Sequence, residues 1–546
     1  MICETFDGLS DVSHDVCIVG AGPVGISLAD EFSKLGRTVL LLESGRRTAN
    51  RYIQQLSDAE IVSPKIHDDM SIAVSRQLGG TSNLWGGICL RFDPIDFLPR
   101  PELFDVRWPI SYAELLPYYD RACWHTQSGA PVYELPIPGF RPEADDFCVH
   151  TLERAVNEQK SQVVHRISLK QNPKIDLRLS ATVVGLNFEA NGVVQSIDIV
   201  RPDGSQRTRL PIKNIIIAAG GLESTRLLLA AQRDAPNRFG GPDGPLGRYY
   251  MGHVIGDISE IVFSNPALAR AFDFFVDAHG SYVRRRFVPS QSTQLREKIL
   301  NSAIFPIVPA VANARHGSAI LSTVYLALAY KPLSRLIVAD AIRKRHIPPH
   351  LTDLPRHLLN ILKGIPEAAV FSADFLRRRY MTKARIPGFF VDSKDLRYRL
   401  AYHSEQLPQA ASRVTLSGES DRTGLPKIRI DLRFHPTDAL SVVRTHELLA
   451  DWLIRAGAGR LVWNDPPEER IEAVLAQAQH GTHQIGTIRM GARKSDAVVD
   501  RDLRAFDSPN LFVASAAVLP TSGQANPTLT AIALAMRLAH NWKGVG

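Results

Sequence analysis

The chain has 546 residues, too many for one simple hydrophobic core, which stops growing near about 250 to 300 residues, so two domains are expected. Its 45% apolar and 22% charged residues exclude disorder on a large scale. Five scattered cysteines without metal-ligand spacing indicate neither a disulfide framework nor a zinc site, so we expect no metal. Those cysteines and an opening segment without the features of a secretion signal favour the cytoplasm.

The first predicted unit is a dinucleotide-binding turn. A buried strand, DVCIV (15–19), runs into GAGPVG, in which Gly20, Gly22 and Gly25 fit the pattern G-x-G-x-x-G. Pro23 suits the first turn of a helix that Gly36 ends, and the strand TVLLLE then delivers Glu43, whose carboxylate can accept from ribose hydroxyls and would repel a 2′-phosphate. The order of strand, glycines, helix, strand and acid predicts dinucleotide binding.

Further along, two β-rich apolar runs, ATVVGL (181–186) and NIIIAAGG (214–221), are separated by a polar turn, VRPDGSQR. This pattern predicts strands that flank a hairpin.

The positive charge is concentrated in one segment. Residues 331–385 contain twelve Lys or Arg and four Asp or Glu, including RKRH (343–346) and RRR (377–379), and account for the whole net charge of +8. The preceding apolar stretch, 318–330, is too short to cross a bilayer. We expect a helical insertion over about 315–390, interrupted near IPPH and at Pro355 and Pro366. Its basic face is either exposed only to solvent or forms a contact with anionic lipid or with an acidic partner. Nucleic-acid binding is disfavoured, because no aromatic residues alternate with the basic ones.

Five blocks carry a family resemblance. They are LGGTSNLWGG (78–87), IIIAAGGLESTRLLL (215–229), GRYYMGH (247–253), HQIGTIRMG (483–491) and the long block from VVDRD to AMRLA (498–539). In this order they resemble the glucose/methanol/choline (GMC) oxidoreductase family over nearly the whole chain, except for roughly 285–390. RWPISYAELLPYYDRA (107–122) and EQLPQAASRVTLS (405–417) resemble its sugar- and polyol-oxidising branch.

The resemblance implies FAD as cofactor. Contacts are expected from the glycine motif and Glu43, and from Gly79, Gly80, Thr81, Asn83, Val183, Ser515, Pro527 and Thr528. Ser515 stands where relatives often have Gly or Asp. Leu84 stands where some sugar oxidases attach the flavin through a histidine, so the FAD is expected to be non-covalent.

The resemblance also implies a catalytic pair, His483 and Asn526. A neutral imidazole is suited to removing the hydroxyl proton while hydride leaves the carbinol carbon for flavin N5. Asn526 precedes Pro527 and an apolar-periodic helix, which predicts that Asn526 caps that helix and holds the substrate oxygen.

The implied architecture is α/β: a discontinuous Rossmann-like FAD-binding domain with an interleaved α+β substrate domain that carries a mixed or antiparallel sheet. The FAD-binding domain would comprise 1–100, 175–255 and 475–546, and the substrate domain 101–174 and 256–474.

The expected reaction is oxidation of CH–OH to carbonyl in a sugar, glycoside or polyol. A sterol, a long-chain alcohol or a lipid-linked sugar at a membrane surface is the alternative substrate, and a flavin-containing hydroxynitrile lyase is the alternative class. The sequence does not distinguish among oxygen, a quinone and a cytochrome as the electron acceptor.

Overall fold

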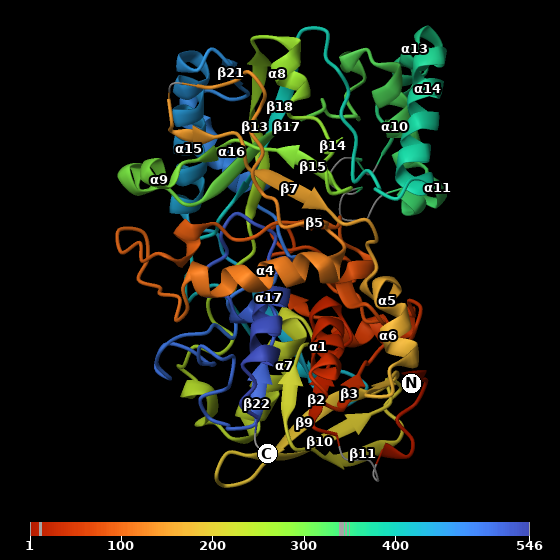
Figure 1. Ribbon diagram of the computed structural model, residues 1–546, viewed down its shortest axis with the longest axis vertical. Coiled ribbons are helices and arrows are strands. Elements are labelled where there is room, and N and C mark those ends of the chain that lie inside the picture. The colour runs from red at the N-terminus through yellow and green to blue at the C-terminus, as the bar shows by residue number, and fades with distance from the viewer. Residues whose placement is uncertain are drawn as a thin grey trace.

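A six-stranded parallel sheet lies at the centre of the lower lobe in Figure 1. The computed structural model describes residues 2–9, 14–142, 144–337, 343, 347–348 and 350–544. The inner strands are buried on both faces, as parallel strands covered by helices must be. The order is β1 (Ile2–Cys3), β8 (Ile175–Arg178), β3 (Val39–Leu42), β2 (Val16–Val19), β12 (Ile215–Ile217) and β22 (Leu511–Val513).

Three long helices pack together beside this sheet. Helix α1 (Pro23–Lys34) lies against β2 and β3 and against α17 (Thr528–His540), which in turn packs on α4 (Tyr112–Thr126). The predicted limits of α1 are confirmed, because Pro23 occupies its first turn and Gly36, with φ of +89°, follows its end.

The two apolar runs enter different sheets on either side of a hairpin. ATVVGL lies in β9 (Thr182–Phe188), which forms an antiparallel sheet with β10 (Val194–Val200) and β11 (Arg207–Pro211), whereas NIII lies in β12 of the parallel sheet. The prediction that these two runs flank a hairpin is therefore confirmed: the hairpin between them is β10 and β11, which the polar turn joins. Only Leu210 of β11 is buried, so its sequence has no apolar alternation to reveal it.

The upper lobe contains an antiparallel sheet, as the expected fold class requires (Figure 1). Helices α15 (Pro436–Arg455) and α16 (Arg470–Gln477) pack against it, and the fully buried Trp452 of α15 lies in the core of this lobe. The strand order is β17 (Ser302–Ile307), β18 (Arg397–Ser404), β13 (Val254–Phe263) and β21 (Gly459–Trp463).

A buried ion pair links segments far apart in the sequence. The guanidinium of Arg100 donates from both terminal nitrogens to the carboxylate of Glu405, at 2.7 Å each, and both side chains are buried. Glu405 directly follows β18, so this pair ties an N-terminal segment to the antiparallel sheet.

Smaller elements complete the described chain. Helix α7 (Gly221–Asp234) follows β12. The other sheets are β14 (Phe275–Val276), β15 (Tyr282–Arg285), β7 (Leu152–Ala155) and β5 (Ile88–Cys89); β16 (Val288–Pro289) and β6 (Phe147–Cys148); and β19 (Arg413–Ser420), β20 (Pro426–Asp431) and β4 (Glu60–Ile61). The remaining short helices are α2 (Arg51–Gln54), α3 (Met70–Ala73), α5 (Ser161–Val164), α6 (Arg166–Gln171), α8 (Pro266–Arg270) and α9 (Gln291–Glu297).

The predicted insertion, 315–390, is mainly helical in its described part. It contains α10 (Ala319–Ala329), α11 (Lys331–Ile337), α13 (Leu354–Lys363) and α14 (Ile365–Leu376), at the right-hand edge of the upper lobe in Figure 1. Pro355 and Pro366 lie in the first turns of α13 and α14. Of the RKRH run only Arg343 is described; residues 344–346 lie outside the described residues. Within the described chain no helix is both long enough and apolar enough to span a bilayer.

Candidate active site

Close backbone contacts shape the turn between β2 and α1. Gly20 has φ of +104°, and a Cβ there would lie 2.7 Å from the carbonyl oxygen of Ala218. A Cβ on Gly25 would lie 1.9 Å from the carbonyl oxygen of Gly20, so α1 approaches the strand this closely only because residue 25 has no side chain. Gly22 and Pro23 place the N-terminal end of α1, with its unpaired N–H groups, at the wall of a cavity.

A second glycine loop meets the first. A Cβ on Gly80 would lie 2.9 Å from the Cα of Gly22. The neighbouring Gly79, with φ of +89°, faces Gln162, whose Oε1 a Cβ would approach to 1.7 Å. The side chain of Asn83 supports the loop by donating to the carbonyl oxygens of Leu78, at 3.1 Å, and Gly80, at 2.8 Å.

The cavity between these loops has a volume of about 1380 Å³, including the space at its mouth. Ten residues singled out from the sequence line it: Gly20, Gly22, Glu43, Gly80, Thr81, Val183, His483, Ser515, Pro527 and Thr528. Four others do not: Gly25, Gly79, Asn83 and Asn526. Gly25, Gly79 and Asn83 instead hold the two loops in place, through the close approaches and hydrogen bonds given above.

Glu43 lies at the end of β3 on the cavity wall. Its two carboxylate oxygens accept from the backbone N–H groups of Ala21, at 2.9 Å, and Gly45, at 2.7 Å. Burial raises the pKa of Glu43, against the lowering effect of these two bonds. Each oxygen retains a second lone pair, so the carboxylate can still accept from a ligand hydroxyl.

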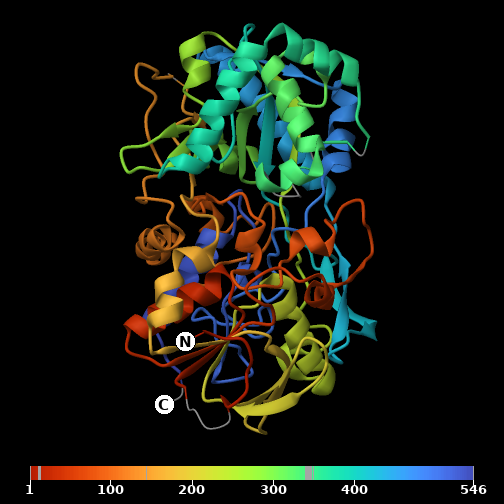
Figure 2. The same ribbon diagram turned by 90° about the vertical axis from the view of Figure 1, so that its right-hand side faces the viewer.

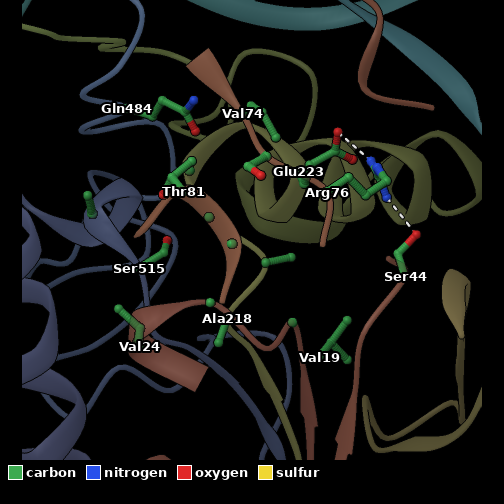
Figure 3. A pocket seen from close by; sticks show the side chains of 18 of the residues that line it. Val19, Val24, Ser44, Val74, Arg76, Thr81, Ala218, Glu223, Gln484 and Ser515 are labelled. Carbon is green, nitrogen blue, oxygen red and sulfur yellow. Dashed lines mark hydrogen bonds and ion pairs between the residues drawn. The ribbon is translucent and has the colours of Figure 1, made fainter. Parts of the chain in front are cut away.

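An ion pair that the sequence analysis missed also lines the cavity. Arg76 lies between Glu223 of α7, with an N–O distance of 2.6 Å, and the hydroxyl of Ser44, at 3.0 Å (Figure 3). Burial opposes ionisation of Glu223, but Arg76 and Arg226 outweigh it and lower its pKa. The signal in the sequence was the pair Glu223 and Arg226, two charged residues three apart that precede the apolar run LLLAA of the same helix.

Asn526 differs from its predicted helix-capping role. Helix α17 begins at Thr528 after Pro527, and no side chain caps it. The Nδ2 of Asn526 instead donates to the carbonyl oxygen of Ile88 over 3.0 Å. This bond orients the amide by tying it to β5, so the prediction that Asn526 caps the helix is wrong.

Three further histidines surround His483. His253 precedes β13, His403 lies in β18, and His480 lies three residues before His483. The His253 ring stacks on His403 with centroids 4.3 Å apart, and the His480 and His483 centroids are 4.5 Å apart. Ring nitrogens of His253, His403 and His483 all lie within 4.8 Å of one another, a spacing that could also hold a metal ion.

The hydrogen bonds of His253 assign a tautomer to His483. The carbonyl oxygen of Ser522, 3.2 Å from Nε2 of His253, can only accept, so this nitrogen carries the proton. Burial, reinforced by His403 and His483, lowers the pKa of His253 well below its usual range, so the ring holds one proton and its Nδ1 is an acceptor. Nδ1 of His483, at 2.7 Å, is then the donor, so the neutral tautomer of His483 that fits this bond has its lone pair on Nε2.

Comparisons with known proteins relate the chain to oxidoreductases. Residues 408–535 match the family model described as GMC oxidoreductase. The chain is 24% identical to paromamine 6'-oxidase of Streptomyces fradiae, over 96% of this chain and 90% of the relative, and 24% identical to 2-methyl-1,2-propanediol dehydrogenase of Mycolicibacterium austroafricanum, over 96% and 94%. The crystal structure of pyridoxine 4-oxidase from Mesorbium loti has a TM-score of 0.55 at 17% identity, over 97% of this chain and 99% of that one, which is a likeness of fold.

Proposed function

We propose, from the premise that this chain belongs to the GMC oxidoreductase family and acts on CH–OH donors, that it uses FAD to oxidise a hydroxyl of a sugar, glycoside or polyol. One observation carries the proposal: His483 lies in the wall of the same cavity as the glycine turn and Glu43. A proton acceptor and a dinucleotide cradle therefore face one space.

The residues present fit FAD. The approaches at Gly20 and Gly80 leave no room for a Cβ, so the backbone can approach a pyrophosphate closely beside the N-terminal end of α1. Glu43 would accept from the ribose hydroxyls. Thr81, Val183, Ser515, Pro527 and Thr528 would complete the contacts, and Leu84 offers no side chain for covalent attachment, so acid denaturation should release free FAD.

The reaction removes a proton from the hydroxyl oxygen and a hydride from the carbon that carries it. Bound FAD would supply the hydride acceptor. His483 takes the hydroxyl proton at Nε2, the nitrogen that holds the lone pair, while Nδ1 remains bonded to His253. The family resemblance assigns the substrate oxygen to Asn526, which does not line this cavity; it would make that contact through the amide groups that its bond to Ile88 leaves available.

The relatives favour the substrate class. They are named for the oxidation of paromamine and of 2-methyl-1,2-propanediol, and a further relative, 22% identical over 97% of this chain, is the fructose dehydrogenase large subunit of Gluconobacter japonicus. Both oxidases and dehydrogenases occur among these names, so the electron acceptor must be determined separately. Formation of hydrogen peroxide in air would identify oxygen as that acceptor.

Anaerobic mixing tests the proposal. The purified protein is mixed with sugars, glycosides, polyols, sterols and long-chain alcohols while the oxidised flavin band near about 450 nm is followed. Bleaching by a sugar or polyol supports the proposal. Bleaching only by sterols or long-chain alcohols would show that these, and not sugars or polyols, are the substrate class. Consumption of a cyanohydrin with the band intact would indicate a lyase, and the lack of a flavin band after addition of FAD would refute the cofactor.

Substitution of the proposed base gives a second test. His483→Ala should retain the flavin band and slow its anaerobic reduction by about 10² to 10⁴, the usual effect of losing a general base. His279→Ala, which removes an exposed histidine, is the control and should reduce at the wild-type rate. Equal reduction rates in the two variants would refute the role of His483.

A further inference from the structure

Helix α13 directs two polar side chains, those of His357 and Asn360, toward the protein. His357 is fully buried, with Nδ1 3.0 Å from the hydroxyl of Ser322 and its ring stacked on Tyr325 at a centroid distance of 4.2 Å. Asn360, also buried, donates to the carbonyl oxygen of Ala314 over 2.9 Å. These bonds set the rotation of α13 against α10, and they leave its other face outward.

That outward face is apolar. Leu354, Leu358 and Leu362 follow one another at intervals of four residues and are all exposed, with Leu362 at 68%. Half of the large apolar side chains that are exposed in the described chain lie between Tyr330 and Met381. A helix of a soluble monomer buries its leucines and exposes its polar residues, so this reversed face indicates a binding surface.

Exposed basic side chains lie on α13 itself and in the segment that follows α14. Arg356 and Lys363 of α13 are exposed, as are Arg377, Lys383 and Arg385 beyond α14. Across 331–385 twelve basic residues outnumber four acidic ones, while the rest of the chain is balanced. Figure 2, which turns this side toward the viewer, shows the helices of the segment at the front of the upper lobe.

We propose that the outward face of α13, continued by Ile365 and Val370 of α14, is a docking surface for an anionic lipid bilayer. The leucines would enter the boundary between headgroups and acyl chains, while the basic side chains contact the phosphates. Long basic stems flanking a row of leucines are typical of helices that lie in the plane of a membrane. The surface is independent of the oxidation chemistry.

Vesicle co-sedimentation of the full-length holoprotein tests this surface. The protein should sediment with vesicles of phosphatidylcholine and phosphatidylglycerol at about 50 mM salt, and only weakly with phosphatidylcholine alone. Binding should fall at about 0.5 M salt, because the electrostatic attraction is then screened over a few ångströms. Absence of sedimentation with the anionic vesicles at low salt would overturn the proposal.

Matched variants locate the contact. Leu362→Asp should weaken binding to the anionic vesicles by about tenfold or more, because it removes a leucine from the lipid contact and adds a repelled charge. Ile454→Asp alters a side chain of almost equal exposure, 69%, in α15 of the same lobe and should bind as the wild type does. Arg356→Glu combined with Lys363→Glu should lose the preference for phosphatidylglycerol.

Two outcomes would assign the surface to something else. If Leu362→Asp and Ile454→Asp weaken binding equally, the lipid contact does not lie on α13. If light scattering shows a dimer that Leu362→Asp dissociates, the face covers a second copy of this chain instead. The flavin band and the unfolding temperature of each variant report whether it has folded.

Discussion

At the scale of single residues, the proton on His253 determines which nitrogen of His483 can act as a base. We predict that His253→Leu slows anaerobic flavin reduction about 10- to 100-fold with little change in KM, because His483 loses the acceptor that orients its ring. His253→Asn, whose amide oxygen can stand near the position of Nδ1, should recover most of the rate. The rate of flavin reduction by the substrate and KM are measured for all three proteins.

A structural role alone predicts otherwise for His253. If both variants lost activity in proportion to their unfolding temperatures, with no recovery by Asn, packing would be its only function. Nitrogen NMR of ring-labelled histidines reports the tautomer of His483 directly, whether or not a substrate has been found. A signal for His483 with the proton on Nε2 would refute the assignment.

The sequence identified only one member of this histidine group. His483 lies in a motif that resembles one of the GMC family, and an imidazole is suited to accepting the hydroxyl proton. His253, His403 and His480 belong to a loop before β13, to β18 and to a turn. Only the three-dimensional fold brings these segments together, and no spacing in the sequence encodes their approach. The same holds for Arg76, which meets Glu223 across more than a hundred residues of chain.

At the scale of elements, the turn from β2 into α1 was predictable because each of its signals is local. Glycines, proline and an acid act on neighbours within about 30 residues, and the buried strands flank them directly. The partner of β12 was not predictable in the same way. Its three isoleucines suit any buried strand, and the choice between a hairpin and the parallel sheet depends on β2 and β22, which lie about 200 and 300 residues away.

The contact between Gly25 and Gly20 makes a prediction for this element. Gly25→Ala places a methyl group 1.9 Å from a carbonyl oxygen, so α1 must move away from β2 and the cradle must open. We expect FAD affinity to fall at least about tenfold, with a loss of stability of about 1 to 3 kcal/mol, typical of overpacking. Fluorescence titration of the apoprotein with FAD measures the affinity.

A second glycine supplies the control for this element. A methyl group added to Gly418 of β19 would meet no atom of the described chain within 4 Å, and the φ of Gly418 is not positive, so Gly418→Ala should bind FAD as the wild type does. If Gly25→Ala also bound FAD normally, the close approach would not be needed for the cradle.

At the scale of the whole molecule, each lobe contains a histidine whose pKa is depressed by its surroundings. Burial, with a contribution from His125, lowers the pKa of His165 to about 4, and burial lowers the pKa of His446 in α15 to about 4. In the unfolded chain such groups titrate near about 6.5. The unfolded state therefore binds more protons between these values, and stability that is fully present above about pH 6.5 is lost as the pH falls toward 4.

We therefore predict that the unfolding temperature falls steadily from pH 6.5 to pH 4, and that His446→Leu reduces this loss. The buried His446 ring lies beside Tyr402 and Trp463, where a leucine can pack and cannot titrate. The free energy of unfolding of the variant should therefore lack the pH dependence due to one proton, which is up to about 1.4 kcal/mol per pH unit. Urea unfolding of the holoprotein at pH 7, 6 and 5 measures this free energy. His279→Leu, at an exposed histidine, is the control and should follow the wild type. Parallel losses in wild type and His446→Leu would mean that the acid sensitivity arises elsewhere, because a buried ring that stays neutral in the folded state must contribute to this slope.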